Sequence, residues 1–310
     1  MDYQNILDRI STAVDPIVRG TKGEGGGKVA RYIPELANVA PDQFGMAIVD
    51  LQGNVYRVGD AEVPFSIQSI SKLFALTLAF HLEGDSIWQR VGREPSGNPF
   101  NSLVQLEREQ GKPRNPFINA GALVVTDILC GRSVSAGNAL VEFIRKLSGN
   151  ARIGYDTKVA VSERHTSDRN AAMAHFMKSF GNLHHEVDTV LDAYCKHCAI
   201  EMNCIDLARA VTFLANRGAI PWSGEKVLDP SSAKRLSALM MTCGTYDAAG
   251  DFAFRVGLPA KSGVGGGIVA LVPNECGICV WSPALEESGN SHAGSIALEM
   301  LTSLSGRSVF

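Results

Sequence analysis

Segments with the pattern of β-strands lie near both ends of this chain, and its long middle part has almost none. The five strands are predicted at residues 45–51, 54–58, 252–256, 267–272 and 277–281. A compact chain must bring such strands together into one sheet, with the middle of the sequence carried as an insertion. This arrangement predicts one α/β domain interrupted by a helical insertion.

Helical periodicity describes most of the remaining sequence. Apolar residues at helical spacing predict an opening helix at residues 3–18, and a final helix is predicted at 293–303. Residues 92–219 have an almost wholly helical pattern, with loops rich in Gly, Pro and Asn. We therefore predict an α/β (α+β) fold with a five-stranded antiparallel sheet flanked by helices. Its parts are a discontinuous sheet domain (1–91 and 220–310) and a helical domain (92–219), with the active site between them.

Charge and hydropathy exclude several classes of partner. With 29 Lys and Arg against 32 Asp and Glu, the net charge is −3, and no basic footprint for nucleic acid is expected. The longest apolar stretch, Leu73–Phe80, is far shorter than the roughly 20 residues that span a bilayer, so no membrane partner is predicted. The first residues lack the charged and apolar regions of a signal peptide, which predicts a cytoplasmic protein.

The cysteines argue against both disulfides and a metal. An odd number of them, seven, is spread along the chain, which is typical of a reducing compartment. Cys195/Cys198 and Cys276/Cys279 have the spacing of zinc ligands, but one pair falls in a predicted helix and the other in a predicted strand. Structural zinc pairs usually lie on turns, so we expect no metal, and no other cofactor is predicted.

A glycine-rich segment, residues 20–28, superficially suggests a phosphate-binding loop. Lys22 stands where that motif needs its first glycine, and Val29 stands where it needs Ser or Thr. We interpret the segment as a flexible loop.

Ser69 and Lys72 form a Ser-x-x-Lys pair at the start of a predicted helix, residues 73–82. A serine hydroxyl is a weak nucleophile, and a neutral lysine one helical turn away can serve as its base. The N–H groups at a helix start can also stabilise a developing oxyanion. The alternative is a chance match in which the serine only caps the helix.

A second lysine motif, Lys261-Ser262-Gly263, lies just before or on a strand near the C-terminus. It is similar to the Lys-Thr-Gly of serine β-lactamases and penicillin-binding proteins, where Ser-x-x-Lys also lies upstream. A second positive charge would lower the pKa of Lys72 by repulsion. The alternative is a glycine-rich hairpin loop with a solvated lysine.

Seven segments in order, covering about residues 30–294, resemble the glutaminase family. They are 31–36, 68–72, 94–97, 115–121, 162–163 with 168–170, 243–247 and 257–264. The resemblance implies a β-lactamase/penicillin-binding-protein-like fold and an amidohydrolase acting on a linear amide. Such an enzyme hydrolyses L-glutamine to L-glutamate and ammonia through a γ-glutamyl-serine intermediate. It also implies a homo-oligomer, dimer or tetramer.

The resemblance further implies roles for individual residues. Ser69 is the expected nucleophile, Lys72 its base, and Lys261 an electrostatic support. Backbone N–H groups of Ser69 and Val264 form the expected oxyanion hole. The expected substrate contacts are Tyr32, Gln68, Ser69, Asn119, Glu163, Asn170, Tyr194, Tyr246 and Val264.

Two of these assignments carry further expectations. Glu163, placed in a polar loop, is the expected partner of the substrate ammonium. Tyr194 or Tyr246 is expected to relay a proton, and the sequence leaves that choice open. For each tyrosine the structural alternative is a half-buried core ring.

Two other functions remain as alternatives. One is a different serine acyl-transfer enzyme of the same fold, such as a β-lactamase, against which the missing signal segment argues. The other is a non-catalytic glutamine sensor, against which Ser69, Lys72 and Lys261 argue. Residues 98–114, which match the family's mobile loop beside the active site, differ from it in detail.

Overall fold

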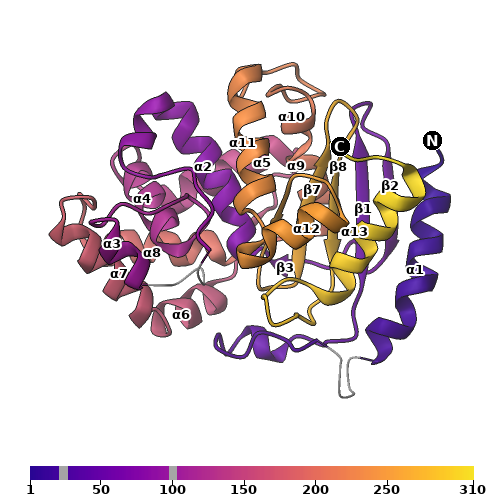
Figure 1. Cartoon of the computed structure of the whole chain (residues 1–310), viewed down its shortest axis with the longest axis horizontal. Helices are drawn as coiled ribbons and strands as arrows, with labels where there is room; N and C mark the ends of the chain where they lie inside the picture. The colour runs from indigo at the N-terminus through magenta and orange to yellow at the C-terminus, as the bar shows by residue number, and fades with distance from the viewer. Residues whose placement is uncertain (21–26, 98–102) are drawn as a thin grey trace.

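The computed structural model of this chain describes residues 1–20, 27–97 and 103–310. In Figure 1 the sheet and the terminal helices lie at the right, and a group of helices lies at the left. Most of the predicted glycine-rich loop at 20–28, and the first part of the predicted mobile loop at 98–114, lie outside the described residues.

A five-stranded antiparallel sheet in the order β2-β1-β8-β7-β6 forms the centre of the fold. Its strands are β1 (Gly45–Asp50), β2 (Val55–Gly59), β6 (Ala260–Ser262), β7 (Gly267–Val272) and β8 (Cys276–Trp281). Gly45 of β1 lies opposite Trp281 of β8, so the central pair of strands joins the two ends of the sequence. The predicted fold class is thereby confirmed.

Helices cover both faces of this sheet, which explains why β1, β7 and β8 are buried along their whole length. Met46 and Ile48 face the core beneath α1 (Tyr3–Arg19) and α13 (His292–Ser305). Ala47 and Val49, with the opposite side-chain direction, belong to the core shared with the helical part. The predicted terminal helices are both confirmed.

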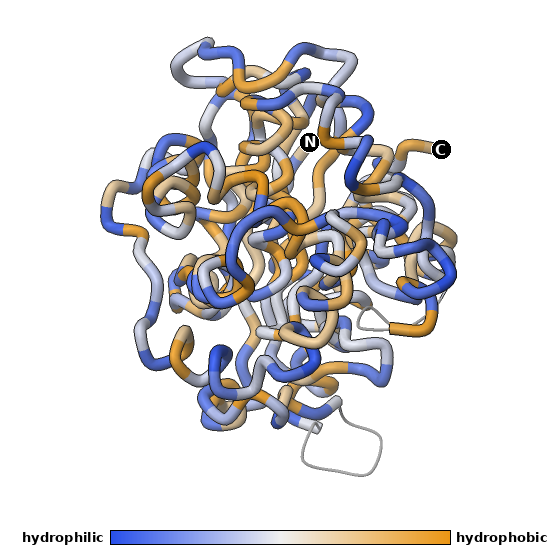
Figure 2. The backbone as a smooth tube through the Cα atoms, turned by 90° about the vertical axis from the view of Figure 1, so that its left-hand side faces the viewer, coloured by the Kyte–Doolittle hydropathy of each residue, from blue (hydrophilic) through white to orange (hydrophobic). Residues whose placement is uncertain are grey.

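The remaining helices pack against one another and, in part, against the sheet. Hydrophilic and hydrophobic residues are mixed along the whole backbone (Figure 2). In chain order the remaining helices are α2 (Ser71–Glu83), α3 (Leu103–Arg108), α4 (Asn119–Cys130), α5 (Ala136–Ser148), α6 (Thr157–His165), α7 (Asp168–Ser179), α8 (Val187–Cys198), α9 (Cys204–Ala210), α10 (Thr212–Ala215), α11 (Pro230–Cys243) and α12 (Ala249–Arg255). Short 3₁₀ turns occupy Leu36–Asn38, Gln68–Ile70, Gly84–Gln89 and Tyr246–Ala248. Although α9 lies within the range predicted as the helical domain, it packs against β1 and β8. The division into domains stays a prediction.

One predicted strand, residues 252–256, is wrong, because most of it belongs to α12. The buried side chains there, Ala249, Phe252 and Val256, follow helical spacing, whereas Phe254 is 90% exposed. Asp251 and Arg255 pair one turn apart, as helical residues do. The fifth strand is instead β6, which begins at Ala260.

A second sheet, in the order β3-β5-β4, is absent from the sequence prediction. Its strands are β3 (Phe65–Ser66), β4 (Gly154–Tyr155) and β5 (Ile200–Met202). Strands of two or three residues are too short to display an alternating pattern. This small sheet nevertheless joins the segment before Ser69 to the end of α8, since Phe65 pairs with Met202.

Candidate active site

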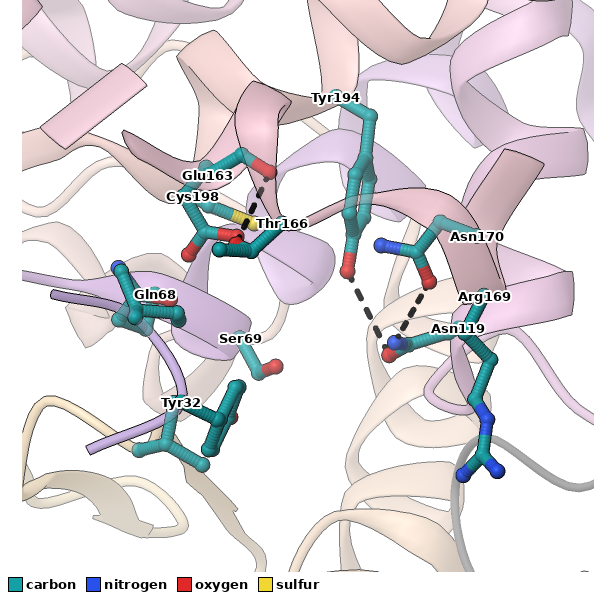
Figure 3. Close-up of a pocket in the computed structure, with 12 residues that line it drawn as sticks. Tyr32, Gln68, Ser69, Asn119, Glu163, Thr166, Arg169, Asn170, Tyr194 and Cys198 are labelled. Atoms are coloured by element: carbon teal, nitrogen blue, oxygen red, sulfur yellow. Dashed lines mark hydrogen bonds between the residues drawn. The ribbon is translucent and has the colours of Figure 1, made fainter. Parts of the chain in front are cut away.

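A cavity of about 320 Å³ brings most of the predicted substrate contacts together (Figure 3). Its lining contains residues from both ends and from the middle of the chain. The lining residues are Tyr32, Ile33, Gln68, Ser69, Asn119, Glu163, Thr166, Arg169, Asn170, Tyr194, Cys198 and Val264. The volume suits a small polar molecule.

Ser69 lies in the 3₁₀ turn that leads into α2, so its placement at a helix start is close to the prediction. The preceding residue, Gln68, has a positive φ of 49°, a conformation that is costly for a residue with a side chain. Such backbone strain is held in place by surrounding structure and is concentrated at functional sites.

The loop between β6 and β7 presses directly on this turn. A Cβ on Gly263 would lie 2.5 Å from the Ile67 carbonyl oxygen, and one on Gly265 would lie 2.3 Å from that of Ser66. Only glycine permits this approach. Val264, between the two glycines, therefore lies against the Ser69 turn and lines the cavity.

Lys72 is buried and contacts a residue of the cavity wall. Its Nζ donates to Asn119 Oδ1 at 2.6 Å and to the Phe117 carbonyl oxygen at 3.4 Å. Burial lowers the pKa of Lys72 to about 8, against the opposing influence of Cys198 and Glu163. A substantial neutral fraction is therefore present near that pH, as a general base requires.

Lys261 is also completely buried. Its Nζ donates to the carbonyl oxygens of Ser262 at 2.6 Å and Gly244 at 3.0 Å, and it lies 4.7 Å from the ring centroid of Tyr246. The pKa of Lys261 is lowered mainly by burial and also by the charge of Lys72. The expectation that Lys261 lowers the pKa of Lys72 is not supported, because burial alone lowers the latter.

Tyr246 lies next to Ser69, although it does not line the cavity. Like Gln68 it has a positive φ, 58°, in the turn that follows α11. Burial raises the pKa of Tyr246, while hydrogen bonds with Ser69, Ser262 and the Val264 backbone oppose the rise. Its phenol is thus neutral and in contact with both the serine and the β6–β7 loop.

Glu163 is a buried carboxylate at the cavity wall. Burial raises its pKa to about 7, and a hydrogen bond from Gln68 and the charge of Lys72 oppose this rise. Its Oε1 has no hydrogen-bond partner among the described residues. A buried acceptor without a partner is costly, so this atom is suited to bind a cationic ligand.

The predicted loop around Glu163 is wrong, because this residue belongs to α6. Asp156 caps that helix by accepting from the backbone N–H groups of Lys158 and Val159. Its buried face consists of Val159, Ala160 and Glu163. Because one member of the face is a carboxylate, the segment lacks an obvious apolar period.

Two asparagines and a tyrosine form the opposite wall (Figure 3). Asn119 Nδ2 donates to Asn170 Oδ1 at 3.0 Å, and the Tyr194 hydroxyl donates to Asn119 Oδ1 at 3.4 Å. Lys72 donates to the same Oδ1, which fixes the orientation of the Asn119 amide. Tyr32, which is 57% exposed, lies at the cavity mouth.

Known proteins similar to this chain point to one family. A family model described as Glutaminase matches residues 27–310. A glutaminase of Ralstonia nicotianae is 68% identical, and one of Paraburkholderia phytofirmans is 63% identical, each over the full length of both chains. The chain belongs to the glutaminase family.

Solved structures agree with this assignment. A probable glutaminase from Bacillus subtilis in complex with 6-diazo-5-oxo-L-norleucine, a glutamine analogue, matches with a TM-score of 0.87 and 35% identity. The match covers 100% of this chain and 98% of that one. This glutaminase is therefore a glutamine amidohydrolase with the β-lactamase-like fold and a small-molecule substrate, L-glutamine.

Two further features concern the part of this glutaminase that the structure describes. No helix there is long and apolar enough to cross a membrane. The same residues contain no group of three or more His, Cys, Asp or Glu side chains arranged to hold a metal ion.

Four residues that line the cavity were missed by the sequence prediction: Ile33, Thr166, Arg169 and Cys198. Sequence spacing carried a signal for three of them. Thr166 and Arg169 lie between Glu163 and Asn170, and Cys198 follows Tyr194 by one turn of α8.

Proposed function

We propose that this glutaminase hydrolyses L-glutamine through a covalent γ-glutamyl ester on Ser69. The observation that carries the proposal is the Ser69–Lys72 pair, in which a buried lysine of lowered pKa lies one turn from a serine in a strained backbone turn. Burial keeps part of the lysine neutral, and strain fixes the hydroxyl before the substrate arrives.

In the first half of the reaction, neutral Lys72 takes the Ser69 proton while Oγ attacks the side-chain carbonyl carbon of glutamine. The backbone N–H groups of Ser69 and Val264 stabilise the oxyanion. When the C–N bond breaks, Tyr246 donates a proton to the leaving ammonia and is reprotonated from Lys72. We prefer Tyr246 over Tyr194 because Tyr246 interacts with Ser69, whereas the Tyr194 hydroxyl donates to Asn119.

In the second half, a water molecule replaces ammonia. Lys72 takes a proton from the water, the oxygen attacks the ester carbon, and Ser69 leaves with that proton. The products are L-glutamate and the free enzyme, so the proton balance closes without a cofactor.

The α-carbon of the substrate carries an ammonium and a carboxylate, so the site must offer acceptors to the first and donors to the second. Among the described residues that line the cavity, Glu163 is the acid and Arg169 the base. The Arg169 side chain forms no hydrogen bond or ion pair with any residue that the structure describes, so its guanidinium is available. We assign the substrate ammonium to Glu163, the carboxylate to Arg169, and further polar contacts to Asn119, Asn170 and Tyr32.

Three broader features belong to the same proposal. They are the division into a sheet domain (1–91 and 220–310) and a helical domain (92–219) with the active site between them, a homo-oligomeric assembly, and a cytoplasmic location. The first is supported by a cavity lining drawn from both parts of the chain. The other two rest on the family resemblance and the composition, and sedimentation measurements would test the assembly.

Ammonia release by wild type and Ser69→Ala tests the mechanism. The variant should lose on the order of 10³-fold or more in kcat and keep its melting temperature. L-asparagine and a chromogenic β-lactam, assayed alongside L-glutamine, should be poor substrates. Retention of more than a tenth of the wild-type rate by a folded Ser69→Ala protein would place the nucleophile elsewhere.

A further inference from the structure

A chain of buried hydrogen bonds runs behind the cavity from the end of α8 to Gln68. Ser66 Oγ donates to the Cys198 carbonyl oxygen at 2.8 Å, and Gln68 Nε2 donates to Ser66 Oγ at 2.9 Å. Ser66 and Gln68 are both buried. Ser66 is not among the cavity-lining residues.

The direction of these bonds determines which way the Gln68 amide faces. A serine hydroxyl has a single proton, and here Cys198 receives it. Ser66 Oγ can then only accept, so it selects the nitrogen of the Gln68 amide and not the oxygen. The opposite orientation would place two acceptors against each other at a buried site.

This orientation determines what Gln68 offers to the substrate. One amide hydrogen binds Ser66, and the Gln68 amide lies close enough to Glu163 to oppose the rise in the pKa of that carboxyl group. The nitrogen of the amide therefore faces Ser66. No described residue donates to Gln68 Oε1, and Glu163 Oε1 is likewise without a partner there. Two acceptors therefore remain available for the three donors of an ammonium group.

We propose that Ser66 is a positioning residue for the substrate ammonium, because it holds the Gln68 amide in the orientation that offers Oε1 beside Glu163. The inference rests on the proposed role of Glu163. With the amide reversed, its NH₂ group would face the substrate cation and its oxygen would face the Glu163 carboxylate. Both contacts would be repulsive.

The backbone around Ser66 is fixed independently of its hydroxyl. Its strand pairs with β5, and the Ser66 carbonyl oxygen lies under Gly265. Removal of the hydroxyl alone should therefore free the Gln68 side chain without moving Ser69.

The test compares Ser66→Ala, Ser66→Thr, Gln68→Ala and the double variant Ser66→Ala/Gln68→Ala. Each is assayed with L-glutamine and with glutaramic acid, which lacks the ammonium. Ser148→Ala is the matched control, since Ser148 is a buried serine whose hydroxyl donates to the Ile144 carbonyl oxygen in α5. Melting temperatures are recorded for all variants, and Glu163→Gln tests the underlying assignment separately.

We expect Ser66→Ala to raise the KM for L-glutamine about tenfold with little change in kcat, as loss of a hydrogen bond to a charged group implies. Its kcat/KM for glutaramic acid should stay unchanged. Ser66→Thr should restore the KM, and in the Gln68→Ala background the Ser66 change should have no further effect. Ser148→Ala should leave both substrates unaffected.

Other results would overturn the inference. Ser66 would have a purely structural role if Ser66→Ala loses activity equally toward both substrates. The same would follow if the effects of Ser66→Ala and Gln68→Ala add up in the double variant. Suppose that Ser66→Ala has no effect, while Glu163→Gln brings the kcat/KM values for L-glutamine and glutaramic acid closer together. The role of Ser66 then fails, and the proposed function stands. If Glu163→Gln also leaves the difference between these values unchanged, the ammonium site itself is misassigned.

Discussion

At the scale of single residues, burial determines the protonation states on which the chemistry depends. Lys72 and Glu163 are both buried, and burial moves their pKa values toward each other, to about 8 and about 7. The proposed mechanism requires neutral Lys72 and, for substrate binding, ionised Glu163. Each group reaches its active form by losing a proton.

The value of kcat/KM for L-glutamine should therefore rise with pH between about 6 and 9, in two overlapping steps that belong to the coupled pair. In Glu163→Gln the lower step should disappear. Lys72→Arg, which cannot deprotonate, should lose on the order of 10²-fold or more at every pH. A wild-type profile that is flat or falls over this range would contradict the assignment of Lys72 as the base.

Arg169 provides a second prediction at this scale. Arg169→Gln should lower kcat/KM for L-glutamine by up to about tenfold, since it removes a charged partner of the carboxylate at a partly exposed site. Activity toward 4-aminobutanamide, which keeps the ammonium and the amide but lacks the carboxylate, should not change. Lys158→Gln, an exposed lysine of α6, is the control for loss of charge alone. An equal fall with both substrates would mean that Arg169 does not contact the carboxylate.

At the scale of elements, the loop between β6 and β7 connects the sheet to the turn that contains Ser69. Trp281 of β8 donates from Nε1 to the Gly265 carbonyl oxygen at 2.9 Å, and its ring stacks on Phe65 just before the turn. The central strand therefore holds both the loop and the turn. This explains how a two-residue strand, β3, can support the segment that contains Ser69.

Gly265→Ala should disrupt this connection, because its Cβ would lie 2.3 Å from a backbone oxygen that cannot easily move. We expect about 1–3 kcal/mol of lost stability and at least a tenfold loss of kcat. Gly250→Ala in α12, where an added Cβ meets nothing within 4 Å, should be neutral or slightly stabilising. Denaturant unfolding and ammonia release measure the two effects, and a fully active Gly265→Ala enzyme would show that the close packing is not required.

At the scale of the whole molecule, the sequence predicted the main architecture because long periodic segments carry their own signal. The strands β1, β2, β7 and β8 and both terminal helices were found in this way. Residues 252–256 were wrongly predicted as a strand, because Phe252 and Phe254 alternate with smaller residues while only Phe252 is buried. A short pattern of this kind does not separate a strand from one turn of helix.

The site was predicted from the family resemblance more than from any pattern. Ser69, Asn119, Glu163 and Tyr194 do converge on one cavity, but nothing local in the sequence reveals that convergence. The proposed roles of Ser66 and Arg169 rest only on the three-dimensional structure. Ser66 lies behind Gln68, and Arg169 lines the cavity without a partner among the described residues. Backbone strain at Gln68 and Tyr246 is equally invisible in the sequence, because neither is a residue type that favours positive φ.

The central claim is that Ser69 forms the covalent bond to the substrate. The most direct measurement is peptide mass spectrometry of the enzyme after inactivation with 6-diazo-5-oxo-L-norleucine, whose diazoketone leaves a stable adduct on an attacking nucleophile. We predict one adduct per chain, on the Ser69 hydroxyl, that excess L-glutamine suppresses and that Ser69→Ala does not form. An adduct on another residue in the wild-type enzyme, or undiminished labelling of Ser69→Ala, would contradict the account.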